Sequence, residues 1–137
     1  MKFRWKGVIF VQFIQTEFSK AKPGLYTPGI ISGNMLYISG QLSRDPATGL
    51  IPEGGIGPET RQALQNLNLV LQAARLQSAD VVMCRIYLPD VALWDTMNLE
   101  YARFFGEHKP ARMVVPSGKL HYGCLVEVEA IAEIHPA

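Results

Sequence analysis

The sequence predicts an α+β protein in which two helices cover one face of a mixed, mostly antiparallel sheet. Short apolar runs bounded by Gly, Pro and Asn are typical of strands, and two segments repeat apolar residues at the helical intervals of three and four. These elements follow one another in the order strands, helix, strand, helix, strands, which favours helices packed on a sheet.

The first predicted strand is the apolar run at 8–14. Basic residues precede it, so it superficially resembles the start of a secretion signal. However, Gln12 interrupts the run, and Thr16 and Glu17 follow it in place of a small-residue cleavage site. The run is also far too short to span a bilayer, so we expect a strand and no membrane segment.

Turn signals fill 23–34, where Pro-Gly and Gly-Asn pairs recur, and a second strand is predicted at 35–39, closed by Gly40. The Asp-Pro and Thr-Gly pairs within 44–49 predict a tight reversal. A short strand at Leu50-Ile51 is expected to follow.

Apolar residues from Pro58 to Ala74 recur with helical spacing, and proline is acceptable in the first turn of a helix. The run at 81–88 is typical of a strand. A second amphipathic helix is predicted at 94–105, where Gly106 stands at the position of a left-handed C-terminal cap.

Two final strands are expected near 111–116 and 124–134. Several strands have apolar residues on both faces; in the first strand these are Ile9, Val11 and Phe13 on one face and Val8, Phe10 and Ile14 on the other. Helices cover only one face of the sheet, so we expect further copies of the chain to bury the other. The clefts between copies are then candidate sites.

Composition is typical of one folded domain over residues 1–137, because 48% of the residues are hydrophobic and 18% are charged. The formal net charge is +1, and no basic run alternates with aromatic residues, so nucleic acid is not an expected partner. Cys84 and Cys124 lie far apart in apolar segments, which favours reduced thiols and a cytoplasmic protein. The three histidines are scattered, and no metal site is expected.

Arg112 follows Pro110-Ala111 and opens an apolar run. A guanidinium at that place needs a partner, and its planar fork fits a carboxylate or phosphate. One interpretation is a small anionic ligand. The other is an internal ion pair with Glu127 or Glu129 on a later strand, and the residue types leave both open.

Several motifs together resemble one family. They are Ser39-Gly40-Gln41, Asp45-Pro46-x-Thr48-Gly49, Thr60-Arg61-Gln62-Ala63-Leu64-x-Asn66-Leu67, Phe104-Phe105-Gly106, Lys109-Pro110-Ala111-Arg112 and Val126-Glu127-Val128-Glu129-Ala130-Ile131-Ala132. In these motifs and in the order of its elements, nearly the whole chain resembles the Rid family, also called YjgF. The resemblance implies a chorismate-mutase-like fold, a homotrimer with clefts between subunits, and no metal or cofactor.

The resemblance also implies an activity. Members with the arginine hydrolyse reactive 2-imino acids, derived from 2-aminoacrylate or 2-aminocrotonate, to 2-keto acids and ammonia. Arg112 would bind the substrate carboxylate, Glu127 would position water or transfer a proton, and Tyr26 would pack on the ligand. Gly40 would offer its backbone carbonyl to the imine N–H.

Further positions correspond to the family's cleft or to its surroundings. Asn98 matches a polar residue near the family's cleft, although an exposed helix amide is the simpler interpretation. Val114 stands where many members have cysteine, two positions after the arginine, and makes the pocket more apolar. Glu129 is expected to have a structural part.

Departures from the family pattern leave three functions open. Leu25 replaces a common proline before the tyrosine, and His121 and Tyr122, in a loop unlike the family's, are candidate cleft residues or solvated loop residues. The first function is deamination of small 2-imino acids. The second is a trimer that binds small carboxylates, such as 2-keto acids, or holds client proteins without turnover. The third is a deaminase for a larger imine in a degradation pathway.

Overall fold

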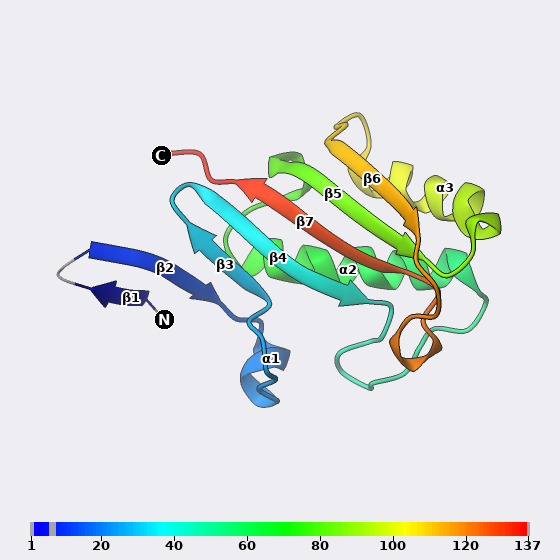
Figure 1. Ribbon diagram of the computed structural model, residues 1–137, viewed down its shortest axis with the longest axis horizontal. Coiled ribbons are helices and arrows are strands. Elements are labelled where there is room, and N and C mark those ends of the chain that lie inside the picture. Colours follow the sequence, from blue (N-terminus) through cyan, green and yellow to red (C-terminus); the bar gives the residue numbers. More distant parts are fainter. Residues whose placement is uncertain (1, 6–7, 137) are drawn as a thin grey trace.

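The computed structural model describes residues 2–5 and 8–136, and its centre is one mixed sheet with helices on one side (Figure 1). Within the described residues the strand order is β1-β2-β3-β4-β7-β5-β6. The strands are β1 Lys2–Trp5, β2 Val8–Ile14, β3 Gly29–Ser32, β4 Met35–Leu42, β5 Val81–Leu88, β6 Ala111–Pro116 and β7 Glu127–Glu133. The α-helices are α1 Glu17–Ala21, α2 Ile56–Ala73 and α3 Trp94–Phe105, and the 3-10 turns are η1 Ser78–Asp80, η2 Val91–Leu93 and η3 His121–Gly123.

All neighbouring strands pair antiparallel except β5 and β6, which are parallel. A parallel pair needs a crossover connection, and α3 supplies it. The last strand, β7, lies between β4 and β5 and so joins the two halves of the sheet. The predicted α+β fold, with a mixed, mostly antiparallel sheet, is confirmed.

The core lies between the sheet and the helices α2 and α3, which Figure 1 shows behind the central strands. The apolar stripes predicted from the helical spacing supply it: Ala63, Leu64, Leu67, Val70 and Leu71 from α2, with Met97, Tyr101 and Phe105 from α3, are buried. Alternate residues of β5 and β7 face these helices and are buried, while their neighbours in sequence are partly exposed on the other face.

The expected strand at Leu50-Ile51 is absent, which corrects that prediction. The backbone N–H of Asp45 donates to the carbonyl of Leu50 at 2.9 Å, so the chain closes a local loop instead of joining the sheet.

The segment expected to hold only turns contains β3, and the strand β1 and the short helix α1 were not predicted. The strand at 8–14 is confirmed, but the predicted alternation at Val8, Ile9 and Phe10 concerns side chains outside the described part of the structure.

Candidate functional site

A hollow opens at the end of β4, and residues of β4, β7, η3 and the helix α2 contribute to its lining. It is lined by Tyr26, Ser39, Gly40, Gln41, Leu42, Arg44, Pro46, Asn66, His121, Tyr122 and Glu127. The segment that carries Tyr26 is tied to β4, because the Ser39 hydroxyl donates to the Thr27 carbonyl at 2.6 Å and the Ser39 N–H donates to Pro28 at 2.9 Å. This fixes Tyr26, which is 68% exposed, beside the end of the strand.

Gly40 and Glu127 are in direct contact across the β4 and β7 pair. The register of this pair shifts between Ile38 and Gln41, so Gly40 lies in an irregular stretch opposite the start of β7. A Cβ atom at position 40 would clash with the Glu127 carboxylate. A side chain at position 40 would therefore displace the Glu127 carboxylate, and glycine leaves that carboxylate in place.

The environment of Glu127 favours its protonated form. Burial raises the pKa of Glu127 above its ordinary value, the charge of Glu129 raises it further, and His121 lowers it in part. A carboxyl group with a raised pKa can accept and return a proton nearer to neutral pH than an ordinary glutamate can. This is the chemistry expected of a residue that handles a proton in a hollow.

Glu129 has partners within its own face of the sheet. The Tyr87 hydroxyl donates to Glu129 Oε1 at 2.9 Å, and Arg85 Nη1 donates to the same oxygen at 3.2 Å. The hydrogen bond to Glu129 is the main reason that the pKa of Tyr87 is raised. Glu129 thus has structural contacts.

Arg112, on the edge strand β6, contacts α3. Its Nη1 donates to Asn98 Oδ1 at 2.5 Å, and its guanidinium carbon lies 4.7 Å from the centre of the Tyr101 ring. The internal ion pair that the sequence left open is therefore wrong: Arg112 pairs with neither Glu127 nor Glu129. Among the described residues, no carboxylate lies within ion-pair distance of Arg112.

The register of the sheet places Arg112 on the helix side. Arg112 pairs with Cys84 and Val114 pairs with Ile86, and both partners on β5 belong to the core beneath the helices. Paired residues on adjacent strands point to the same face. Arg112, Asn98 and Val114 therefore form one group on the helix side of the sheet.

The second group lies on the opposite side. Glu127 pairs with Tyr87 on β5, and Tyr87 points away from the helices toward Glu129. Tyr26 and Gly40 border the hollow together with Glu127. Within one chain, the six residues expected to bind or transform a substrate are thus divided into two groups of three.

Arg44 was not recognised as a candidate from the sequence, although it borders the hollow. Its guanidinium carbon lies 3.8 Å from the centre of the Tyr122 ring, and the His121 and Tyr122 rings are 3.6 Å apart. His121 and Tyr122 both line the hollow, in agreement with their selection as candidate cleft residues. Only the tertiary fold brings Arg44 to them.

Metal ligands, cysteines and long apolar helices bear on the kinds of site that the chain can form. No group of three His, Cys, Asp or Glu residues suited to hold a metal ion occurs in the described part of the chain. Cys84 and Cys124 are free and buried, as expected for reduced thiols. No helix within residues 2–5 and 8–136 has both the length and the hydropathy that a membrane span requires.

The fold and the polar hollow define the class of this protein: a small α+β protein of a fold that binds small molecules. The family model described as Endoribonuclease L-PSP matches residues 18–134, and the chain belongs to this family, which includes the YjgF and RidA proteins.

Relatives in sequence and structure agree with this assignment. The chain is 42% identical to a RutC family protein of Pyrococcus horikoshii, covering 93% of this chain and 97% of that protein. It is 36% identical to the 2-iminobutanoate/2-iminopropanoate deaminase of Escherichia coli, covering 87% and 94%. The structure of RidA from Psychrobacter superposes with a TM-score of 0.82 at 34% identity, covering 90% and 99%. The structure of Escherichia coli TdcF with bound serine gives 0.83 at 31% identity, with the same coverage.

Proposed function

We propose that this protein hydrolyses 2-imino acids to 2-keto acids and ammonia, in sites that two copies of the chain build together. One observation carries the proposal. A cation suited to bind a carboxylate and a carboxyl group suited to handle a proton lie on opposite faces of one sheet. Stacking a second copy on this sheet is a way to bring the two groups together.

Arg112 binds the carboxylate of the substrate. It is exposed, it is oriented by Asn98 and Tyr101, and no described carboxylate competes for it. Two charge-assisted hydrogen bonds to a substrate carboxylate would each contribute on the order of 1.5–3 kcal/mol in a desolvated site. Val114, two positions further along β6, contributes apolar surface to the same wall.

Glu127 positions the attacking water and takes up its proton. Water adds to the carbon of the C=N bond while one of its protons passes through Glu127 to the nitrogen, which gives a carbinolamine. The proton of the new hydroxyl then passes through Glu127 to the same nitrogen as the C–N bond breaks, so that ammonia leaves and the carbonyl forms. Positioned acid and base groups of this kind contribute roughly 100- to 10,000-fold in rate. The raised pKa of Glu127 suits this exchange. Water is the only co-reactant, so the reaction needs no cofactor.

Tyr26 and Gly40 hold the reacting end of the substrate. The exposed ring of Tyr26 provides a surface on which a planar imine packs, and its hydroxyl is available to the substrate or to water. The Gly40 carbonyl would accept a hydrogen bond from the imine N–H, since no side chain at position 40 obstructs the approach.

The two groups of residues are best united in a homotrimer. Arg112 on β6 and Glu127 on β7 are separated by β5, which is about 10 Å at the usual strand spacing, and they face opposite sides. A closed ring of three copies gives three equivalent sites. The relatives support the ligand class, because one is named an iminobutanoate/iminopropanoate deaminase and the structure of another contains serine, which has an α-carboxylate.

The test is the release of ammonia and keto acid from 2-iminopropionate and 2-iminobutyrate generated in place by an amino-acid oxidase. We expect acceleration over the spontaneous reaction, and loss of that acceleration in the Arg112→Ala variant. The absence of any acceleration by the folded wild-type protein, with keto acids still bound, would instead support a protein of this family that binds carboxylates without turnover.

A further inference from the structure

Arg44 adds a second guanidinium to the Glu127 side of the site. Its Nε donates to the Gly49 carbonyl at 2.9 Å, and its guanidinium lies over the Tyr122 ring. No carboxylate among the described residues forms an ion pair with it. Arg44 thus borders the hollow without an acidic partner from the described residues.

The backbone that carries Arg44 is firmly held. Asn66 on α2 is buried, and its Nδ2 donates to the Leu42 carbonyl at 2.9 Å and to the Arg44 carbonyl at 2.7 Å. Next to it, the buried Ser43 hydroxyl donates to Glu59 at 2.6 Å. Buried hydrogen bonds of this kind rigidify the segment, so Arg44 projects from a fixed base.

Tyr122 adopts a strained backbone conformation that keeps its ring against Arg44. Its φ is 61°, in the left-handed region that a bulky residue rarely occupies. The strain does not serve burial, because Tyr122 is 55% exposed. Strained residues concentrate at functional sites, and here the result is a His121, Tyr122 and Arg44 stack along one wall of the hollow.

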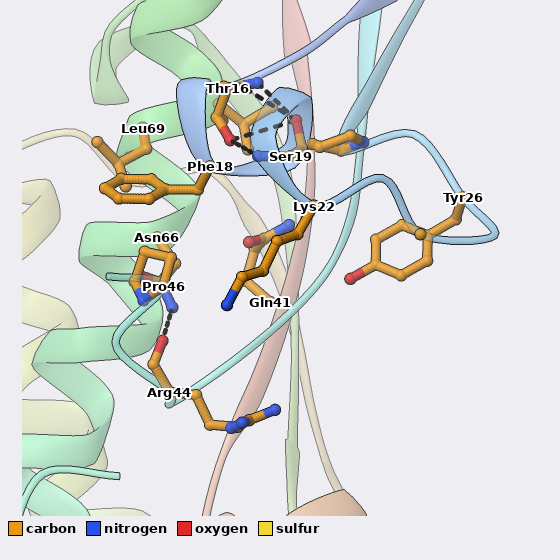
Figure 2. A pocket seen from close by; sticks show the side chains of 13 residues that line it. Thr16, Phe18, Ser19, Lys22, Tyr26, Gln41, Arg44, Pro46, Asn66 and Leu69 are labelled. Atoms are coloured by element: carbon orange, nitrogen blue, oxygen red, sulfur yellow. Dashed lines mark hydrogen bonds between the residues drawn. The ribbon is translucent and has the colours of Figure 1, made fainter. Parts of the chain in front are cut away.

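A second hollow of about 320 Å³ adjoins the first, with which it shares Arg44. Figure 2 shows side chains that line this second hollow. Tyr26, Gln41, Arg44, Pro46 and Asn66 line both hollows. In Figure 2 the Lys22 side chain extends toward Gln41, and the Tyr26 hydroxyl points to the same side. Lys22 and Arg44 are charged residues of this lining, which includes no Asp or Glu. The extension therefore favours an anionic group.

We propose that Arg44, with Lys22 beyond it, binds a second carboxylate, so that the preferred substrates are dicarboxylic 2-imino acids. This inference rests on the proposed function. The α-carboxylate of the substrate would bind Arg112 of one copy, the imine carbon would lie at Glu127 of another, and the side-chain carboxylate would reach Arg44 of that second copy. A guanidinium that lacks an internal acidic partner is well suited to this task.

A binding experiment tests the proposal with two stable keto acids of equal length. 2-Oxoglutarate and 2-oxopentanoate differ only in the distal carboxylate, and their dissociation constants would be measured by calorimetry on the full chain. We expect the wild type to bind 2-oxoglutarate about tenfold more tightly, the effect of one charge-assisted hydrogen bond. In Arg44→Gln this ratio should fall to about one. In the control Arg75→Gln, which changes an exposed arginine just after α2, the ratio should stay as in the wild type.

Turnover measurements distinguish the proposed role of Arg44 from the proposed deaminase activity. 2-Iminosuccinate, generated by L-aspartate oxidase, would be compared with 2-iminobutyrate. A higher kcat/KM for 2-iminosuccinate that Arg44→Gln reverses would support the second carboxylate. Turnover of 2-iminobutyrate without any preference for the diacid, in rate or in binding, would overturn the role of Arg44 and leave the deaminase intact. Failure to turn over either imine would count against the proposed function, while the keto-acid ratio would still decide the role of Arg44.

Discussion

Arg112 and Glu127 lie on opposite faces of the same sheet, with the strand β5 between them. Arg112 lies on the side of the helices, where Asn98 and Tyr101 orient it, and Glu127 lies on the side of the hollow. No rotamer of either side chain crosses a packed sheet. Chemistry that needs both groups must therefore use two copies of the chain, and this relationship governs how variants should behave.

Removing the guanidinium should abolish substrate binding while leaving the fold intact. Arg112 is exposed on the edge strand β6. We expect Arg112→Ala to lower kcat/KM by about 100-fold or more, since two charge-assisted hydrogen bonds are lost. Arg112→Lys should recover only part of this, because an ammonium cannot bind a carboxylate through a planar fork. Steady-state kinetics beside thermal unfolding would measure both effects, and full activity of Arg112→Ala would refute the carboxylate-binding role.

A methyl group at position 40 should displace Glu127. The Cβ of Gly40→Ala would clash with the carboxylate, so we expect a loss of kcat without comparable unfolding. Gly57→Ala in α2 is the matched control, because its Cβ would make an ordinary 3.7 Å contact with Thr96 on α3. That variant should keep activity and change stability little, because Gly57 is the second residue of α2 and the cost of glycine applies to helix interiors. Equal activity of the two variants would contradict the contact.

The raised pKa of Glu127 has a consequence for stability. Folding favours the protonated carboxyl, so its contribution is fully present below the ordinary pKa and is lost as the pH rises through the raised folded value. Glu127→Gln mimics the protonated form. We expect this variant to unfold at a higher temperature than the wild type at pH 7 and to lose the advantage near pH 4, as measured by calorimetry across that range.

The pH dependence of kcat/KM should also report the ionisation of Glu127. Glu127 must be ionised to accept the proton of water, so kcat/KM should fall as the pH drops through its pKa. His121 lowers this pKa in part. His121→Gln should therefore move the acidic limb of the pH profile to higher pH, and an unmoved limb would show that His121 does not act on Glu127.

Removing the hydroxyl of Tyr101 should stabilise the fold, whereas removing the hydroxyl of Tyr87 should destabilise it. The buried hydroxyl of Tyr101 has no hydrogen-bond partner among the described residues, and burial raises its pKa to about 12. Tyr101→Phe keeps the ring under Arg112 and should stabilise the fold by up to about 1 kcal/mol. Tyr87→Phe removes the hydrogen bond to Glu129 and should destabilise it by about 1 kcal/mol. Denaturant unfolding of both variants measures the difference.

Helices and strands whose apolar residues recur at a regular spacing could be predicted from the sequence. Short strands that depend on pairing with neighbouring strands could not. Both long helices could be predicted because their buried residues recur at intervals of three and four. The strand at 81–88 could be predicted from its run of apolar residues. The strand β3 was missed because it is short and bounded by turn signals, and its ladder depends on β2 and β4. Leu50-Ile51 has apolar residues, but the Leu50 carbonyl accepts from the Asp45 N–H within a local loop.

The candidate site shows the same limit. The residue types of Arg112 and Glu127 pointed to their chemistry, yet the face that each occupies follows from the register with β5. Arg44 carried no local signal, because its partner Tyr122 is far along the chain and meets it only in the fold. Sequence patterns thus identified reactive groups, and the sheet register determined which of them share a site.

The measurement that tests the central claim most directly is subunit complementation. Arg112→Ala and Glu127→Gln, each inactive alone, would be mixed, unfolded together and refolded, and the mixture assayed with 2-iminobutyrate. Sites built from two copies recover one intact pair of Arg112 and Glu127 in mixed oligomers, so we expect a substantial fraction of wild-type activity to return. A mixture as inactive as its parents, with mixed oligomers confirmed by native mass spectrometry, would contradict a site shared between copies.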